Sequence, residues 1–128
     1  MESIKPIRML DRTLITGPQI AVCFNAAEWC VVCANFGLTN YEFPGDTSTV
    51  HFELPGGGLL VVVCFDLDEL ALLPSFTVVG VIVHEANHVW QRYRAYIGEH
   101  APSKEFEAYA VESLAVNLLT AYASGKAQ

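Results

Sequence analysis

Basic residues are scarce in this sequence of 128 amino acids. It contains 7 Lys and Arg against 14 Asp and Glu, which gives a formal net charge of −7 with neutral histidines. The basic residues are also scattered, whereas a protein that binds nucleic-acid phosphates through its surface needs clustered Lys and Arg. We therefore expect no nucleic-acid partner. The acidity permits a basic substrate or partner, although in most proteins it serves solubility.

Long apolar runs are also missing. No segment reaches the roughly 18 to 20 apolar residues that a membrane-spanning helix needs, so we expect no membrane partner. The stretch from Met1 to Met9 carries charges with no apolar segment behind it, unlike a signal peptide. With 52% hydrophobic residues and no internal repeat or long linker, the chain has material for one core. We expect a single domain over residues 1–128, located in the cytoplasm.

The cysteines do not form a recognisable site. The segment Trp29–Cys33 superficially resembles the thioredoxin redox motif, but the intervening residues are Val-Val and no βαβ series follows. A four-cysteine zinc site needs two close pairs, and Cys23 and Cys64 do not form one. We expect all four, Cys23, Cys30, Cys33 and Cys64, to be reduced and buried, three of them on one helix. Reduced thiols fit the cytoplasm.

One short motif carries chemistry. His84-Glu85-Ala86-Asn87-His88 is an HExxH sequence inside an apolar run that is compatible with a largely buried helix. Residues four apart lie on one helix face, so His84 and His88 can direct their imidazoles at one metal ion. Glu85 lies about 100° around the helix from His84 and can reach a metal-bound water. This arrangement is typical of a zinc hydrolase, and the His/His/Glu donor set favours zinc over magnesium or calcium.

The motif alone leaves the third metal ligand open. After His88 the sequence contains no Asp or Cys and one further histidine, His100. The long metzincin pattern would need Gly at position 91 and His at position 94, where this chain has Gln91 and Arg94. The remaining candidates are Glu99, His100, Glu105, Glu107 and Glu112.

Hydropathy and turn residues predict an α+β fold. Residues 18–36 are expected to form an N-terminal helix, with Gly37 just past its end. Thr49–Leu54 alternates apolar and polar residues, and Leu59–Phe65 is an apolar run of strand length. The Pro-Gly-Gly-Gly turn between them completes a predicted β-hairpin. Leu10–Thr16 is a candidate third strand.

Two long helices are expected in the second half of the chain. The HExxH motif lies in a predicted helix that begins at Ser75 and ends near Gly98, where glycine stops helices. Ser103 is then the expected N-cap of a helix from about Lys104 to Ala123. All five candidate third ligands therefore lie at the end of the first helix or on the second one.

The spacing of the motif and a downstream glutamate resembles the gluzincins, with 18 residues between His88 and Glu107. In that group two histidines on one helix and a glutamate on the next bind zinc. The stretch from Glu107 to Val111 is similar to the glutamate helix of many small HExxH proteins. The resemblance implies that His84, His88 and Glu107 bind one Zn²⁺ per chain and that Glu85 is the general base.

The same resemblance implies a minimal zincin-like core of the α+β class. It would contain an N-terminal helix, a β-hairpin or small antiparallel sheet, the HExxH helix and the glutamate helix. In zincins a sheet edge lies above the metal and binds an extended peptide as an added strand. Either Thr49–Leu54 or Leu59–Phe65 would supply that edge. Glu112 would accept a hydrogen bond from a histidine N–H, or be an exposed helix carboxylate.

Several segments also resemble small proteins that tailed bacteriophages encode. That resemblance implies a viral origin and the cytoplasm of a bacterial host as the setting, but it says little about the substrate. The segments are Leu10–Thr16, Val50–Phe52, His84–Gln91, Ile97–Glu99 and Glu105–Tyr109.

These residues predict a zinc-dependent peptidase that cleaves a protein or peptide substrate with a metal-activated water. Gluzincin aminopeptidases carry a Gly-x-Met-Glu-Asn motif that is missing here, so we favour an endopeptidase. The chain is too short for the second subdomain that usually completes the cleft, which points to a homo-oligomer or a phage protein partner. The alternative function is a metal-stabilised, non-catalytic phage assembly or binding protein with a zincin core.

Overall fold

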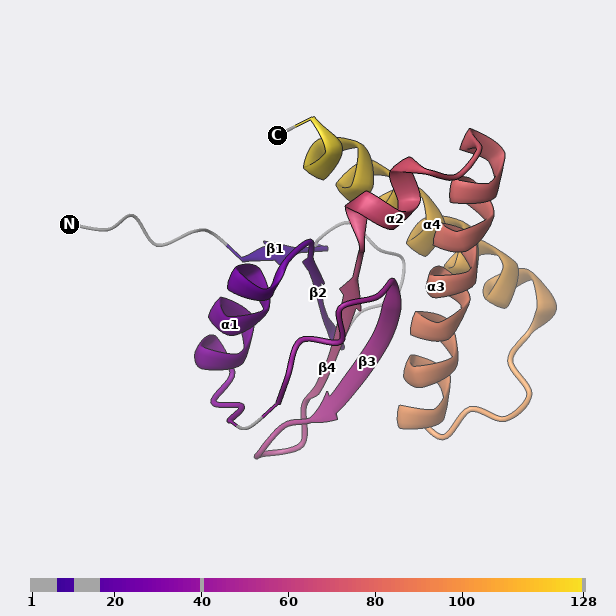
Figure 1. Ribbon diagram of the computed structural model, residues 1–128. Helices are drawn as coiled ribbons and strands as arrows, with labels where there is room; N and C mark the ends of the chain where they lie inside the picture. Colours follow the sequence, from indigo (N-terminus) through magenta and orange to yellow (C-terminus); the bar gives the residue numbers. More distant parts are fainter. Residues whose placement is uncertain (1–6, 11–16, 40, 128) are drawn as a thin grey trace.

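The computed structural model describes residues 7–10, 17–39 and 41–127 (Figure 1). This part of the chain forms four helices and one sheet of four strands, which confirms the α+β class. Residues 11–16 lie outside the described residues, and with them most of the candidate strand Leu10–Thr16. Among the described helices, none combines the length and the apolar character that crossing a bilayer requires.

The sheet is mixed and has the strand order β1-β2-β4-β3. The strands are β1 (Arg8–Met9), β2 (Gln19–Cys23), β3 (Ser48–Glu53) and β4 (Leu59–Cys64). The pairs β1–β2 and β3–β4 are antiparallel, whereas β2 and β4 are parallel. The predicted hairpin is therefore confirmed as β3–β4, whereas the alternative of a small antiparallel sheet is wrong, because β2 and β4 are parallel.

The prediction of one helix over residues 18–36 is wrong in its first half. Residues Gln19–Cys23 form β2, and the helix α1 covers only Ala26–Asn35. The apolar stretch of β2 is buried beside β4, as a short run in a central strand should be. Asn25 then caps the helix, because its side chain accepts a 2.8 Å hydrogen bond from the Glu28 amide. Gly37 follows the helix with a φ of 70°, as expected.

The two long helices of the second half are confirmed. Helix α3 covers Ser75–Tyr96 and helix α4 covers Lys104–Lys126. Ser103 is the N-cap of α4, since its hydroxyl accepts a 3.1 Å hydrogen bond from the Phe106 amide. A short helix, α2 (Leu67–Ala71), lies between β4 and α3 and was not expected.

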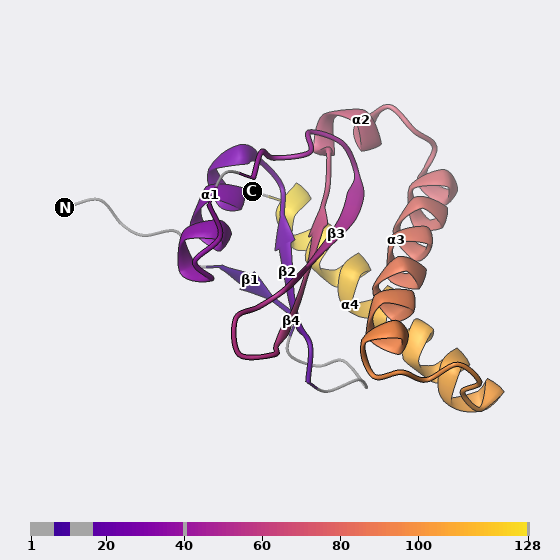
Figure 2. The ribbon, with the colours of Figure 1, turned by 90° about the horizontal axis from the view of Figure 1, so that it is seen from below.

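The sheet separates two cores and makes three layers (Figures 1 and 2). Helix α1 covers one face, and α3 and α4 cover the other. All six residues of β4 are buried, because successive side chains enter opposite cores: Leu59, Val61 and Val63 face α3 and α4, whereas Leu60, Val62 and Cys64 face α1. As an edge strand beside α3, β3 positions the site described below.

The cysteines differ from the expectation in two respects. Cys23 lies in β2 rather than on a helix, and Cys30 is exposed. All four are free thiols, and Cys23 pairs in register with Cys64 across the parallel strands. Burial raises the pKa of Cys23 to about 12, with a further contribution from Glu28. Burial also raises the pKa of Cys33 and of Cys64, so these inward-facing thiols stay protonated near neutral pH.

Candidate functional site

The two histidines of the motif converge on one side of α3. Nε2 of His84 and Nε2 of His88 lie 3.1 Å apart, and the two rings meet edge to face with centroids 4.6 Å apart. Nδ1 of His88 lies 3.1 Å from Oε1 of Gln91. With its proton on Nδ1, His88 donates to Gln91 and keeps a lone pair on Nε2, directed at His84.

The separation of the two Nε2 atoms is also the one that a shared metal requires. Two nitrogen ligands at the zinc–nitrogen distance of about 2.0–2.1 Å, arranged tetrahedrally, are roughly 3.3 Å apart. The observed 3.1 Å therefore fits two positions of a zinc site with little movement. His84 is exposed and His88 is half-buried, so the expectation of a largely buried motif helix does not hold for the histidine side.

Glu85 faces the sheet. It is 4% exposed, and its Oε1 accepts a 2.8 Å hydrogen bond from the Thr49 hydroxyl of β3. A buried carboxylate destabilises the fold unless it accepts a hydrogen bond. Thr49 donates that hydrogen bond to Glu85 from the neighbouring strand. Glu85 therefore lies beside the histidine pair with one oxygen already fixed.

A cavity of about 240 Å³ connects the histidines with the edge strand. From α3 it is lined by His84, Glu85, His88 and Arg92, and from β3 and the residue before it by Thr47, Ser48 and Thr49. A cavity of this size holds a short polar group or part of a peptide, but no large ligand. The arrangement can bind a metal ion between two imidazoles and place a carboxylate next to it.

Glu107 lies elsewhere around α3. Its Oε2 accepts a 2.7 Å hydrogen bond from Nε1 of Trp90 and lies 3.9 Å from Nη1 of Arg94. At 100° per residue, Trp90 and Arg94 project roughly 120° to 160° away from His88. The structure thus brings His84, Glu85 and His88 together and leaves Glu107 on the side of α3 that packs against α4.

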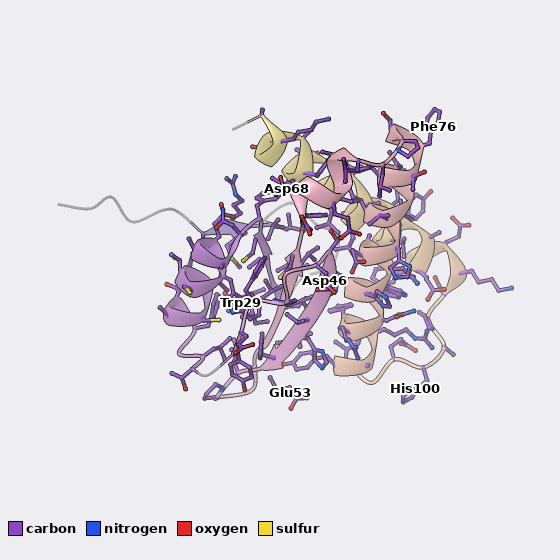
Figure 3. The ribbon with its side chains drawn as sticks, viewed as in Figure 1. Trp29, Asp46, Glu53, Asp68, Phe76 and His100 are labelled. Atoms are coloured by element: carbon purple, nitrogen blue, oxygen red, sulfur yellow. The ribbon has the colours of Figure 1, made fainter. Side chains whose placement is uncertain are left out.

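The other candidate ligands do not join the histidines either. Glu99 and His100 lie in the α3–α4 loop, where Arg94 binds both of their carbonyl oxygens at 2.9 and 2.8 Å. Figure 3 shows His100 at the margin of the molecule. Glu105 and Glu112 are exposed on α4. In residues 7–10, 17–39 and 41–127, no group of three or more His, Cys, Asp and Glu is arranged to hold a metal ion.

Sequence reasoning missed Thr49 and Arg92 as site residues. Arg92 follows His88 by four residues, so helical spacing alone would have placed it on the same face. Thr49 had no comparable signal, because its role depends on the packing of β3 against α3.

Comparisons with protein-family models, with curated proteins and with solved structures find no match to this chain.

Proposed function

We propose that this protein is a zinc-dependent peptidase, with endopeptidase activity favoured. His84 and His88 are the proposed metal ligands, and Glu85 is the proposed general base. One observation carries the proposal most directly: the 3.1 Å convergence of the two Nε2 atoms beside a buried, strand-anchored glutamate. A histidine pair that only stabilises the fold needs no carboxylate buried next to it.

The chain's own residues supply the proton transfers of this proposal. Zinc, when bound, polarises a scissile carbonyl and brings the pKa of a water towards neutrality. Thr49 holds Oε1 of Glu85, so Oε2 is the oxygen that accepts the proton of the attacking water. Glu85 then delivers this proton to the leaving amine. Gln91 fixes the ring of His88 from its far side, as a hydrogen-bond partner of a metal ligand does.

Glu107 is the proposed third ligand, on the strength of the gluzincin resemblance. Its carboxylate is held by Trp90 and by the nearby Arg94 on another side of α3, so the proposal requires these contacts to break and the carboxylate to move towards the histidines when metal binds. The histidine pair fits two positions of the site without such a change.

The proposed substrate is an extended peptide that adds a strand to β3. Of the two candidate edges, β4 lies between β2 and β3, and within the described residues β3 pairs with β4 alone. The outer edge of β3 therefore offers the backbone groups that bind an added strand. The cavity with Glu85 opens along the same strand.

The first test is the metal content of purified protein. We expect elemental mass spectrometry to find about one zinc per wild-type chain and almost none in His88→Ala, both purified without added metal. Glu85→Gln should keep the zinc and lose cleavage of unfolded protein substrates, because only the base is removed. A wild-type chain that binds no zinc, under conditions that load known zinc peptidases, would refute the proposal.

A second function, a metal-stabilised phage assembly or binding protein, is favoured by one feature. Phe76 is 92% exposed and Leu72 is 85% exposed, and exposed apolar surface of this kind is typical of protein contacts. Figure 3 shows Phe76 projecting from the end of α3. This function would survive Glu85→Gln and fail in His84→Ala, whereas a peptidase fails in both.

A further inference from the structure

Arg92 is the one cation among the described residues that line the cavity. It lies on α3, one turn beyond His88, and its side chain is exposed. Within the described residues it makes no ion pair, whereas Arg8 pairs with Glu28 and Arg94 with Glu107. Because no carboxylate of the described residues is paired with Arg92, its exposed guanidinium is open to a ligand in this part of the structure.

Strand β3 and α3 run alongside each other in the same direction, which places Arg92 opposite the edge strand. Thr49 contacts Glu85, and further along Tyr96 donates a hydrogen bond to the Gly57 carbonyl. Between these points, Arg92 is near enough to His51 for its charge to lower the pKa of His51, in addition to the larger effect of burial. Arg92 therefore faces the path of a peptide that adds to β3.

The spacing along α3 sets where on the peptide Arg92 acts. Four residues separate Arg92 from His88, which is about 6 Å of helix rise. An extended peptide covers about 3.3 Å per residue, so the same length corresponds to roughly two residues. A group bound at Arg92 therefore belongs to a residue close to the scissile bond.

We propose that Arg92 binds a carboxylate of the peptide substrate, within two residues of the bond that is cleaved. This inference rests on the proposed peptidase function, and it names the substrate class as peptides with an acidic side chain or a terminal carboxylate at that position. A guanidinium is always charged and binds both oxygens of a carboxylate in one plane. The net charge of −7 does not oppose this, because distant charges are screened beyond about 8 Å at physiological ionic strength.

A binding experiment tests the carboxylate site without relying on cleavage. The full chain with Glu85→Gln, immobilised with and without added zinc, is incubated with a randomised library of acetylated, amidated hexapeptides. Retained peptides are identified by mass spectrometry. We expect Asp and Glu to be enriched about tenfold or more over Asn and Gln at one position. A charge-assisted hydrogen bond to a carboxylate raises the affinity by about this factor. The enrichment should vanish when Arg92→Gln is added and be partly restored by Arg92→Lys.

Controls separate this inference from the peptidase proposal. Lys104→Gln removes an exposed cation from α4, away from the cavity, and should leave the preference intact. A second library with free C-termini shows whether the terminal carboxylate or a side chain occupies the site. Absence of acid enrichment, or enrichment that persists in Arg92→Gln, overturns the inference even if zinc binds and cleavage occurs. Acid enrichment by a chain that proves unable to bind zinc would instead leave the carboxylate site standing and refute the peptidase.

Discussion

The Thr49 hydroxyl donates a 2.8 Å hydrogen bond to Oε1 of Glu85 and so joins the edge strand β3 to the helix that carries both histidines. Because Glu85 is buried, this contact fixes the carboxylate beside the site rather than leaving it to rotate in water. The strand that would bind the substrate and the proposed general base are thus positioned by the same contact.

Replacing Thr49 with valine tests this link. Valine keeps the shape but removes the donor, so the buried carboxylate loses its hydrogen bond. We expect the free energy of unfolding to fall by about 1–3 kcal/mol and the kcat for peptide cleavage to fall roughly tenfold. Zinc content should not change, because the hydrogen bonds of the histidines run to each other and to Gln91, and that of Thr49 runs to Glu85. Urea denaturation, steady-state kinetics and elemental analysis measure these quantities.

Thr49→Ser is the matched control, since serine retains a hydroxyl at the same position. It should keep most of the activity, and the loss of a methyl group should cost little stability. Equal activity of Thr49→Val and wild type would show that the hydrogen bond does not orient Glu85 for catalysis.

Glu107 has two possible roles that substitution separates. As an acceptor for Trp90 it stabilises the fold, and as a metal ligand it holds zinc. Glu107→Gln keeps an oxygen that can accept from Trp90 but removes the charge that zinc prefers. If Glu107 is the third ligand, we expect Glu107→Gln to lower zinc affinity at least tenfold with a near-normal melting temperature. Glu107→Ala should in addition lower the free energy of unfolding by about 1–3 kcal/mol.

Isothermal titration with zinc, together with thermal unfolding, measures both effects. Glu112→Gln, on the same helix and exposed, is the control. Unchanged zinc affinity in Glu107→Gln would mean that Glu107 only supports Trp90, and that the third ligand comes from elsewhere.

Local signals in the sequence were sufficient for the helices that carry the site. Ser103 and the turn glycines mark real helix and hairpin ends, because capping and turn formation depend on neighbouring residues. The β2 strand was mistaken for helix because a short apolar run beside a helix has no period that distinguishes the two states. The local signal that marks the boundary between the strand and α1 is Asn25, which caps the helix.

The site was predictable only in part, for a similar reason. Helical spacing places His84 and His88 together without knowledge of the fold. The side of α3 that α4 covers depends on tertiary packing, so Glu107 could be assigned only through a family resemblance. The contact between Thr49 and Glu85 joins residues 36 positions apart and leaves no trace in local sequence.

Two glycines inside helices should respond oppositely to alanine. At Gly125 a Cβ atom would lie 2.3 to 2.7 Å from the ring of Phe24, which stacks on Phe65 and has little room to move. We expect Gly125→Ala to lower the free energy of unfolding by about 1–3 kcal/mol through overpacking. At Gly80 nothing lies within 4 Å of the added atom. Gly80→Ala should raise stability by about 0.5–1 kcal/mol, because alanine favours helix.

Urea denaturation of both variants checks this pair. Each substitution adds the same methyl group in a helix, so their difference isolates the contact with Phe24. Stabilisation by Gly125→Ala would mean that α4 does not pack against Phe24 in solution.

The buried thiols should make the protein less stable in alkali. The pKa of Cys23 in the folded state is raised to about 12 from its ordinary value of 9.0. Above pH 9 the unfolded chain therefore releases the thiol proton while the folded chain retains it, so the unfolded state gains free energy of ionisation. The contribution of this thiol to the free energy of unfolding is complete below pH 9 and is lost as the pH rises towards 12. The loss reaches up to about 1.4 kcal/mol per pH unit for one thiol.

Cys23→Ala should flatten this dependence, because it removes the titrating group from the unfolded and folded states alike. The measured quantity is the slope of the unfolding free energy against pH between 9 and 11, so the constant cost of a smaller core residue does not enter. Cys30→Ala is the matched control, because it removes an exposed thiol instead of a buried one. A slope that Cys23→Ala does not change would show that Cys23 ionises equally well in both states, and hence that β2 does not lie buried beside β4 at this position.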